Sequence, residues 1–278
     1  MLQPCRERFA QVSLYPVQTP FMALQEAQGM RYKIRRVLAR LRSRILAAMQ
    51  ALAIPLSLAD ERSNPFGLSS RRMFILNRRF FIAREIIRTL AADTRSVLLS
   101  DSRDVVLQAD PFLTMGQGCH TGMEYRTHGE SPINGQWIRS TYGEDGFEAL
   151  KDQLVLCSGV TLGSREGVLT YLDCFCAEIA ACAVLRRTVL IPIWDQAYHN
   201  AILRRSGSPP VTLMPWRSPL ATVGEVPTED LTLEADGSVS IGGLVPAILH
   251  QYDRHPEISS AICERQAELA DTHNATKH

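Results

Sequence analysis

The sequence predicts an α/β fold built on a mostly parallel sheet with helices on its faces. Apolar residues at helical spacing over residues 74–90 precede a short run rich in Val and Leu at 96–99, as expected for a helix that leads into a buried strand. The same order recurs where a long pattern rich in Leu, Ala and Cys at 165–187 precedes the apolar run 188–193 and a helical pattern at 197–204. Helices that alternate with strands are typical of parallel sheets, whose ligands bind at the carboxyl ends of the strands.

Composition sets the broad class of the protein. The chain has 278 residues, of which 45% are hydrophobic and 21% charged, as in an ordinary globular protein with a substantial core. Its 30 basic and 29 acidic residues give a formal net charge of +1, so no overall field favours nucleic acid as a partner. No run approaches the ~20 apolar residues of a membrane span, and the N-terminus lacks the pattern of a secretory signal. We therefore expect a cytoplasmic protein.

The seven cysteines are odd in number and include no C-x-x-C pair, which argues against a disulfide scaffold or a structural zinc site. Cys174, Cys176 and Cys182 fall on one predicted helix, where free cysteines most often fill a core. We interpret them as reduced thiols.

The N-terminal region predicts an irregular start and one basic amphipathic helix. Residues 1–29 show no sustained period, whereas arginines and lysines at 31–46 alternate with an apolar stripe spaced by three and four in a helical pattern that extends over 31–52. Such a helix can pack on its own domain with solvated arginines, lie on an anionic membrane or bind another partner. Peripheral contact with the inner face of a membrane through residues 31–46 is one of these open alternatives.

We divide the chain into residues 1–60, which hold this start and helix, a main domain at 61–258, and a C-terminal helix and tail at 259–278. Residues 119–137 of the main domain are polar, aromatic and rich in glycine, and we expect them to form an active-site loop. An Asp-Gly pair within the alternating pattern at 231–241 predicts a small C-terminal hairpin.

Three further elements complete the predicted order. A short apolar segment covers residues 154–160, a strand at 245–249 ends at His250, and a short helix covers 258–269.

Two carboxylates follow the predicted strand at 96–99. Asp101 and Asp104 come after the apolar run and before a turn at Asp110-Pro111. A hard divalent ion such as Mg²⁺ or Mn²⁺ binds carboxylate oxygens and often completes its shell with phosphate oxygens of a substrate. The alternative is structural, with Asp101 ending the strand and Arg103 paired with Asp104.

Four motifs then occur in order between residues 96 and 256. They are S-D-S-R-D, which ends at Asp104 before a D-P-F turn, C-S-G-V-T-L-G from Cys157, D-Q-A-Y-H-N from Asp195, and L-H-Q-Y-D-R-H-P, which contains His250. Together they resemble the motifs of GT-A fold nucleotide-sugar glycosyltransferases, most nearly glycosyltransferase family eight and related bacterial transferases. The resemblance implies a GT-A, Rossmann-like fold, and transfer of a sugar from a nucleoside diphosphate donor, UDP-linked, to a hydroxyl of a glycan or another acceptor.

The resemblance also implies roles for single residues. Asp101, Asp104 and His250 would hold Mn²⁺ or Mg²⁺ against the diphosphate, and the imidazole favours manganese. The ion would neutralise the leaving group as a Lewis acid. Asp195 and Gln196 would face the donor sugar and act as the catalytic pair.

Three more residues would line the donor site. Ser158 and Gly159 would shape its floor, where a small residue lets the sugar approach the backbone, and Arg103 would contact a phosphate. Taken singly, His250 could be an ordinary hydrogen-bonded histidine, and Asp195 could cap the helix that follows it.

Two departures from the family pattern bear on function. Cys157 stands where the relatives carry Asn, and the strand that normally begins the nucleotide-binding half is not identifiable in residues 1–60. Either the N-terminal, nucleotide-binding part is divergent, or the chain starts late and its catalysis is weakened.

Three functions remain open. The first is the metal-dependent glycosyltransferase. If the reaction retains configuration, as in the family-eight relatives, no strong base is required and the leaving phosphate can take the acceptor proton. If it inverts, a carboxylate such as Asp195 or Glu124 must act as base. The second is a catalytically weakened nucleotide-sugar or glycan-binding protein of the same fold. The third is a module that acts on a membrane or nucleic acid through residues 31–46.

Overall fold

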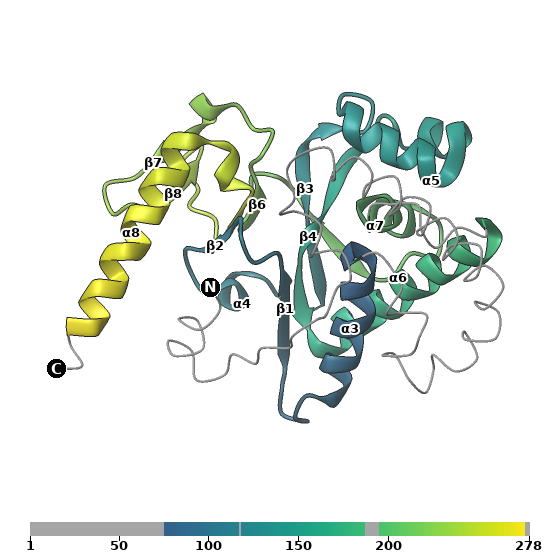
Figure 1. The fold of residues 1–278 in the computed structure, drawn as a ribbon, viewed down its shortest axis with the longest axis horizontal. Helices are drawn as coiled ribbons and strands as arrows, with labels where there is room; N and C mark the ends of the chain where they lie inside the picture. The colour runs from purple at the N-terminus through teal and green to yellow at the C-terminus, as the bar shows by residue number, and fades with distance from the viewer. Residues whose placement is uncertain (1–74, 117, 187–194, 276–278) are drawn as a thin grey trace, which may run out of the picture.

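The structure, a computed structural model, describes residues 75–116, 118–186 and 195–275. Figure 1 shows a sheet in the middle of the molecule, helices on one side of it, and two small sheets with a long C-terminal helix on the other. The fold is therefore a mixed α/β fold. The predicted helix at 31–52 and the predicted strand at 188–193 lie outside the described residues.

The central sheet has the strand order β1-β4-β3-β5. These strands are β1 (Ser96–Ser100), β4 (Leu154–Ser164), β3 (Cys119–Thr127) and β5 (Val211–Met214). β4 runs antiparallel to both β1 and β3, and only β3 and β5 are parallel. The expectation of a mostly parallel sheet is thus wrong for the described strands, because the chain reverses direction between β3 and β4 and because β3 was not recognised as a strand.

β3 lies in the segment that we expected to be an active-site loop. It pairs with neighbours on both edges, and residues 119–122 and Glu124 are buried, with Met123 partly buried. Both of its faces are covered, so it lacks the alternation of apolar and polar residues that marks a half-buried strand. Two of its buried polar side chains, Thr121 and Glu124, make hydrogen bonds within the protein. The rest of the segment begins the helix α5 (Pro132–Leu150).

A second sheet has the order β2-β9-β6, with β2 (Val105–Leu107) antiparallel and β6 (Leu220–Thr222) parallel to β9 (Ile248–His250). Residues 101–104, which we call the acidic segment, thus connect β1 of the central sheet to β2 of this second sheet. The chain continues into the one-turn helix α4 (Pro111–Thr114), where the side chain of Asp110 accepts a hydrogen bond from the Phe112 N–H.

The expected hairpin is confirmed. β7 (Leu231–Leu233) pairs antiparallel with β8 (Val239–Ile241) around Gly237, whose φ of 77° suits a glycine turn. Two single-turn 3₁₀ helices, η3 (Thr228–Asp230) and η4 (Tyr252–Arg254), complete this part of the chain.

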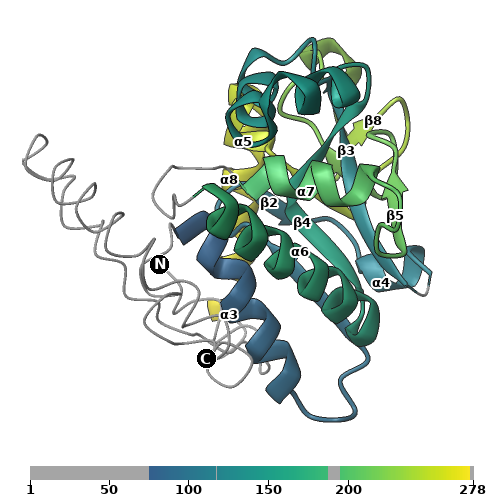
Figure 2. The same cartoon turned by 90° about the vertical axis from the view of Figure 1, so that its right-hand side faces the viewer.

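Three helices pack along one face of the central sheet, and Figure 2 shows them side by side. They are α3 (Ile75–Thr89), α6 (Arg165–Arg186) and α7 (Asp195–Arg204). Their core includes Phe80, Tyr171, Phe175 and Ile202. Cys176 and Cys182 of α6 belong to this core, as expected, whereas Cys174 is only partly buried and lies outside it. The six described cysteines are all free.

The C-terminal helix α8 (Pro256–Ala275) is longer than the predicted 258–269. It packs through Ile258 and Ile262 against a second core that includes Ala221 and Leu249. Within the described part of the chain, no helix has both the length and the apolar character needed to cross a membrane.

Candidate metal centre

The C-S-G motif forms a bulge in β4. Leu156 pairs with Met123 and Thr161 pairs with Thr121, so residues 157–160 stand opposite the single residue Gly122. Bulges of this kind redirect side chains and are frequent beside functional sites. Here the bulge turns Cys157 and Gly159 toward His250 of the second sheet.

The helix α7 holds the bulge through the side chains of its D-Q-x-x-x-N motif. The Asn200 side chain accepts a hydrogen bond from the Leu156 N–H at 2.8 Å and donates one to the Leu156 carbonyl at 2.9 Å. The Gln196 Oε1 accepts a hydrogen bond from the Ser158 N–H at 3.3 Å. These amides satisfy backbone groups that the bulge removes from the strand ladder.

A buried chain of hydrogen bonds supports the same segment. The Tyr171 hydroxyl lies 2.7 Å from His199 Nδ1, and His199 Nε2 lies 3.1 Å from the Thr121 hydroxyl. Burial lowers the pKa of His199 to about 3, so its imidazole is neutral and its Nε2–H can donate to Thr121. The Thr121 hydroxyl in turn donates to the Cys157 carbonyl at 3.0 Å.

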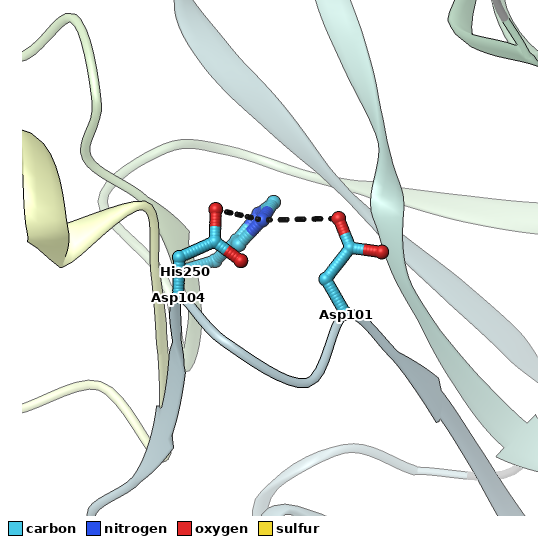
Figure 3. A group of neighbouring side chains, drawn as sticks. All are labelled: Asp101, Asp104 and His250. Carbon is cyan, nitrogen blue, oxygen red and sulfur yellow. Dashed lines mark ion pairs between the residues drawn. The ribbon is translucent and has the colours of Figure 1, made fainter. Parts of the chain in front are cut away.

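Three predicted metal ligands converge where the two sheets meet. Asp101 follows β1, Asp104 precedes β2, and His250 ends β9 (Figure 3). The distance from His250 Nε2 is 3.8 Å to Asp101 Oδ2 and 3.6 Å to Asp104 Oδ2. Backbone bonds from the Asp101 N–H to the Gly159 carbonyl and from the Gln251 N–H to the Asp104 carbonyl fix the acidic segment at both ends.

The three side chains fit a divalent cation. His250 is 1% exposed, and its Nε2 is buried without a hydrogen-bond partner. Both distances to the carboxylates exceed a hydrogen bond, whereas donor atoms around an octahedral ion with bonds of about 2.1 Å lie about 3.0 to 4.2 Å apart. Among the described residues, this is the one group of three His, Cys, Asp or Glu side chains close enough to share an ion.

The other ring nitrogen of His250 faces Cys157. Its Nδ1 lies 3.2 Å from the Cys157 Sγ, so a hydrogen on Nδ1 leaves the lone pair of Nε2 for a metal. Burial alone lowers the pKa of His250, but Cys157 and Asp104 raise it more, to a net value of about 10. Without a cation, His250 therefore holds a proton beside the carboxylates.

Arg79 of α3 is a site residue that our sequence analysis missed. Its guanidinium bonds Asp101 Oδ1 through Nη1 and Asp195 Oδ2 through Nη2, the latter at 2.6 Å. It thereby ties a predicted metal ligand to the start of α7. The only signal in the sequence is the pair Arg78-Arg79 among the apolar positions of α3.

The predicted catalytic pair is buried and already hydrogen-bonded. Asp195 is 6% exposed, pairs with Arg79, and accepts from the Gln196 N–H at 2.9 Å. Burial raises its pKa, against the lowering effect of Arg79. The Gln196 Nε2 donates to Glu124 Oε1 and to Asn134 Oδ1, each at 2.8 Å. All the polar atoms of the Gln196 side chain thus bind protein groups.

The predicted donor-binding residues lie in different environments. Ser158 is buried beside Gln196, and Gly159 lies directly against the metal ligands. The Arg103 side chain is 87% exposed and makes only a 3.4 Å ion pair with Asp253. Of these three residues, Arg103 alone has a charged side chain, and that side chain is exposed.

Glu124 of β3 lies at the edge of this site. It is 3% exposed, and its Oε1 accepts the hydrogen bond from Gln196. Burial raises its pKa to about 7, although the bond from Gln196 lowers it. A buried carboxyl that titrates near neutrality can accept or release a proton in a reaction.

Comparison with known proteins assigns no function to this arrangement of residues. No family model matches the chain, no curated protein matches it, and no solved structure matches it. The functional argument therefore rests on the residues themselves.

Proposed function

We propose that the protein is a metal-dependent glycosyltransferase that moves a sugar from a nucleoside diphosphate donor, UDP-linked, to a hydroxyl acceptor on a glycan or another molecule. The observation that carries the proposal is the convergence of Asp101, Asp104 and His250 around an unpartnered, buried Nε2. The order of the four motifs supports a GT-A type of site in particular.

The ligand set suits Mn²⁺ or Mg²⁺. Two carboxylates and one imidazole leave the remaining positions of an octahedral ion to diphosphate oxygens and water, and the imidazole favours Mn²⁺. The bound ion supplies Lewis acidity that offsets the charge on the leaving diphosphate. Arg79 keeps Asp101 turned toward His250, and the exposed Arg103 is free to reach a phosphate oxygen.

Asp195 and Gln196 support the site from the side of α7. Asp195 holds the guanidinium of Arg79, which stands between it and Asp101. Gln196 holds the bulge at Ser158 and orients Glu124. In this proposal the donor sugar lies beside the metal centre, where the absence of a side chain at Gly159 lets His250 and Asp101 approach the bulged backbone of β4.

A second candidate is a nucleotide-sugar or glycan-binding protein of the same fold with weakened catalysis. One observation favours it: the Gln196 amide, which the family resemblance directs at the donor sugar, is used entirely inside the protein.

The experiment that separates the two candidates measures donor cleavage and donor binding together. UDP-glucose, UDP-galactose and UDP-N-acetylglucosamine are each incubated with the protein in Mn²⁺ and in EDTA, and release of UDP is followed. We expect cleavage of at least one donor that requires Mn²⁺ and falls at least ~100-fold in Asp104→Asn, since that variant loses a charged ligand.

Asp110→Asn is the matched control, because Asn can still cap α4. Its activity should equal that of the wild type. Binding of a donor by calorimetry without any cleavage would support the second candidate. If the protein binds neither Mn²⁺ nor any of the three donors, both candidate functions are contradicted.

A further inference from the structure

We infer that three buried residues, Thr121, His199 and Tyr171, are positioning residues of the metal centre. They raise its affinity for Mn²⁺ by holding Cys157 in place beside His250. The family resemblance gives none of the three a role. The inference rests on the metal centre of the proposed function, and it holds whichever donor sugar the protein uses.

The three residues connect the helix core to the metal centre through a relay of hydrogen bonds. Tyr171 lies on α6, His199 on α7 and Thr121 on β3. The Tyr171 hydroxyl lies 2.7 Å from His199 Nδ1, and His199 Nε2 lies 3.1 Å from the Thr121 hydroxyl. The Thr121 hydroxyl lies 3.0 Å from the Cys157 carbonyl, and the Cys157 Sγ lies 3.2 Å from His250 Nδ1. All five residues are at most 1% exposed.

Donor and acceptor chemistry gives the relay one direction. A carbonyl oxygen only accepts, so the Thr121 hydroxyl must donate to Cys157, because two oxygens 3.0 Å apart repel each other without a hydrogen between them. Thr121 then accepts from His199 Nε2–H, which leaves Nδ1 to accept from the Tyr171 hydroxyl. This arrangement requires a neutral imidazole, and burial lowers the pKa of His199 to about 3. Each donor of the relay therefore has an acceptor.

Thr121 holds the bulge of β4 at both ends. Its hydroxyl lies 3.0 Å from the Cys157 carbonyl and 3.3 Å from the Val160 carbonyl, and these two residues enclose Ser158 and Gly159. A bulge interrupts the strand ladder, so a side-chain bond takes the place of a bond that a regular strand would receive. The relay thus fixes the backbone of Cys157, and with it the direction of the Cys157 side chain.

The direction of the Cys157 side chain decides how His250 is held. The Sγ accepts the hydrogen of Nδ1 at 3.2 Å, which leaves Nε2 with a lone pair for the cation. A second group near Nδ1, the Thr222 hydroxyl, lies at 3.5 Å, longer than a good hydrogen bond. A shift of Cys157 would therefore weaken the bond that orients the ring, and Mn²⁺ would meet a less ordered imidazole.

The relay is tested by calorimetric titration of Mn²⁺ into variants of Thr121. Thr121→Val keeps the shape of the side chain and removes its hydroxyl. Loss of a group that bonds a metal ligand directly weakens metal binding roughly 10- to 100-fold, and Thr121 acts one bond further away. We therefore expect the Kd for Mn²⁺ to rise at least ~5-fold in Thr121→Val. It should stay within about twofold of wild type in Thr121→Ser, which restores the hydroxyl.

Thr141→Val is the matched control. Thr141 is also 1% exposed, and its hydroxyl donates to the Trp137 carbonyl at 2.7 Å within α5, a helix that supplies none of the metal ligands. The control loses the same kind of buried hydrogen bond. Its melting temperature should therefore fall while its Kd for Mn²⁺ stays that of the wild type, which separates positioning of the metal centre from general stability.

A double variant shows whether the effect passes through Cys157. Changes at independent sites multiply in the Kd, whereas changes at two points of one path do not. We expect Thr121→Val added to Cys157→Ala to raise the Kd for Mn²⁺ by less than about twofold over Cys157→Ala alone. The full rise of Thr121→Val on this background would overturn the path through Cys157.

The far end of the relay supplies a second variant. Tyr171→Phe removes the donor to His199 and should raise the Kd for Mn²⁺ about 2- to 3-fold, and it decides the question if the melting temperature shows that Thr121→Val does not fold. An unchanged Kd in folded Thr121→Val, or failing that in Tyr171→Phe, overturns the inference and leaves the metal centre standing. A wild type that binds no Mn²⁺ instead contradicts the metal centre, the proposed function and this inference together.

Discussion

Gly159 lies directly against the imidazole of His250. A Cβ built at this position would overlap His250 Cε1, lie 2.8 Å from Nε2 and lie 2.9 Å from Asp101 Oδ2. The backbone of Gly159 does not have a positive φ, so the requirement for glycine here is space and not backbone conformation. The atoms that a methyl group would meet are two of the three candidate metal ligands.

Substitution of Gly159 should therefore block the metal centre while the protein still folds. We expect Gly159→Ala to weaken Mn²⁺ binding at least ~10-fold, because the side chains of His250 and Asp101 must move away to accept the methyl group. Isothermal calorimetry with Mn²⁺ measures the effect. Gly116→Ala is the control, since a Cβ there meets nothing within 4 Å, and equal affinity in the two variants would contradict the geometry of the centre.

Cys157 should strengthen the binding of Mn²⁺ by orienting the imidazole of His250. The Sγ lies 3.2 Å from Nδ1 and accepts the hydrogen that leaves Nε2 free for a metal. Loss of such an outer partner typically weakens metal binding 10- to 100-fold, so we expect Cys157→Ala to raise the Kd for Mn²⁺ about 10-fold. The exposed Cys263 supplies the matched control, Cys263→Ala. An unchanged Kd in Cys157→Ala would show that the thiol does not orient the ring.

Arg79 should stabilise the protein through the buried Asp195. The Asp195 side chain is 8% exposed and the Arg79 side chain 31%. Removing the Arg79 guanidinium leaves the buried Asp195 without its charged partner, which costs about 2 kcal/mol after allowance for the partly exposed guanidinium. We expect Arg79→Met to lower the free energy of unfolding by this amount in urea titrations, and Arg79→Met combined with Asp195→Asn to recover most of it. Additive losses in the double variant would mean that the two side chains do not interact.

The ionisation of Glu124 should make the free energy of unfolding depend on pH. Burial raises its pKa from 4.5 to about 7 in the folded protein, so the folded state binds more protons than the unfolded state between these values. This contribution is fully present below pH 4.5 and is lost as the pH rises through about 7. The free energy of unfolding of the wild type, relative to Glu124→Gln, should fall by about 3 kcal/mol over this range.

The measurement compares urea unfolding of the two proteins at several pH values across that range. Titration of other groups, such as the neutral buried His199, cancels in the difference. A difference that does not vary with pH would mean that Glu124 ionises normally in the folded protein.

The sequence indicated several elements with accurate positions. The helix at 74–90, the strand at 96–99, the helix at 165–187 and the hairpin at 231–241 all correspond to observed elements. Each depends on a regular local repeat or on turn chemistry, which adjacent residues determine. β3 was missed because a strand buried on both faces carries no such alternation.

The ligand types of the metal centre were also readable from the sequence alone. The carboxylates after the strand at 96–99 indicated a hard cation by their chemistry, whereas His250 was added to the ligand set through the resemblance to the glycosyltransferase motifs. The structure adds that Asp101, Asp104 and His250 do converge.

Only the tertiary structure decided which other side chains meet this centre. The pairing of Arg79 with Asp101 and Asp195, the bond between Glu124 and Gln196 and the clearance at Gly159 each depend on how separate elements pack. Whether neighbouring strands run parallel or antiparallel was also decided only by the tertiary structure, because the local pattern of a strand is identical in both cases. Residue type and local period are properties of the chain, whereas proximity between distant segments is a property of the packed sheets and helices.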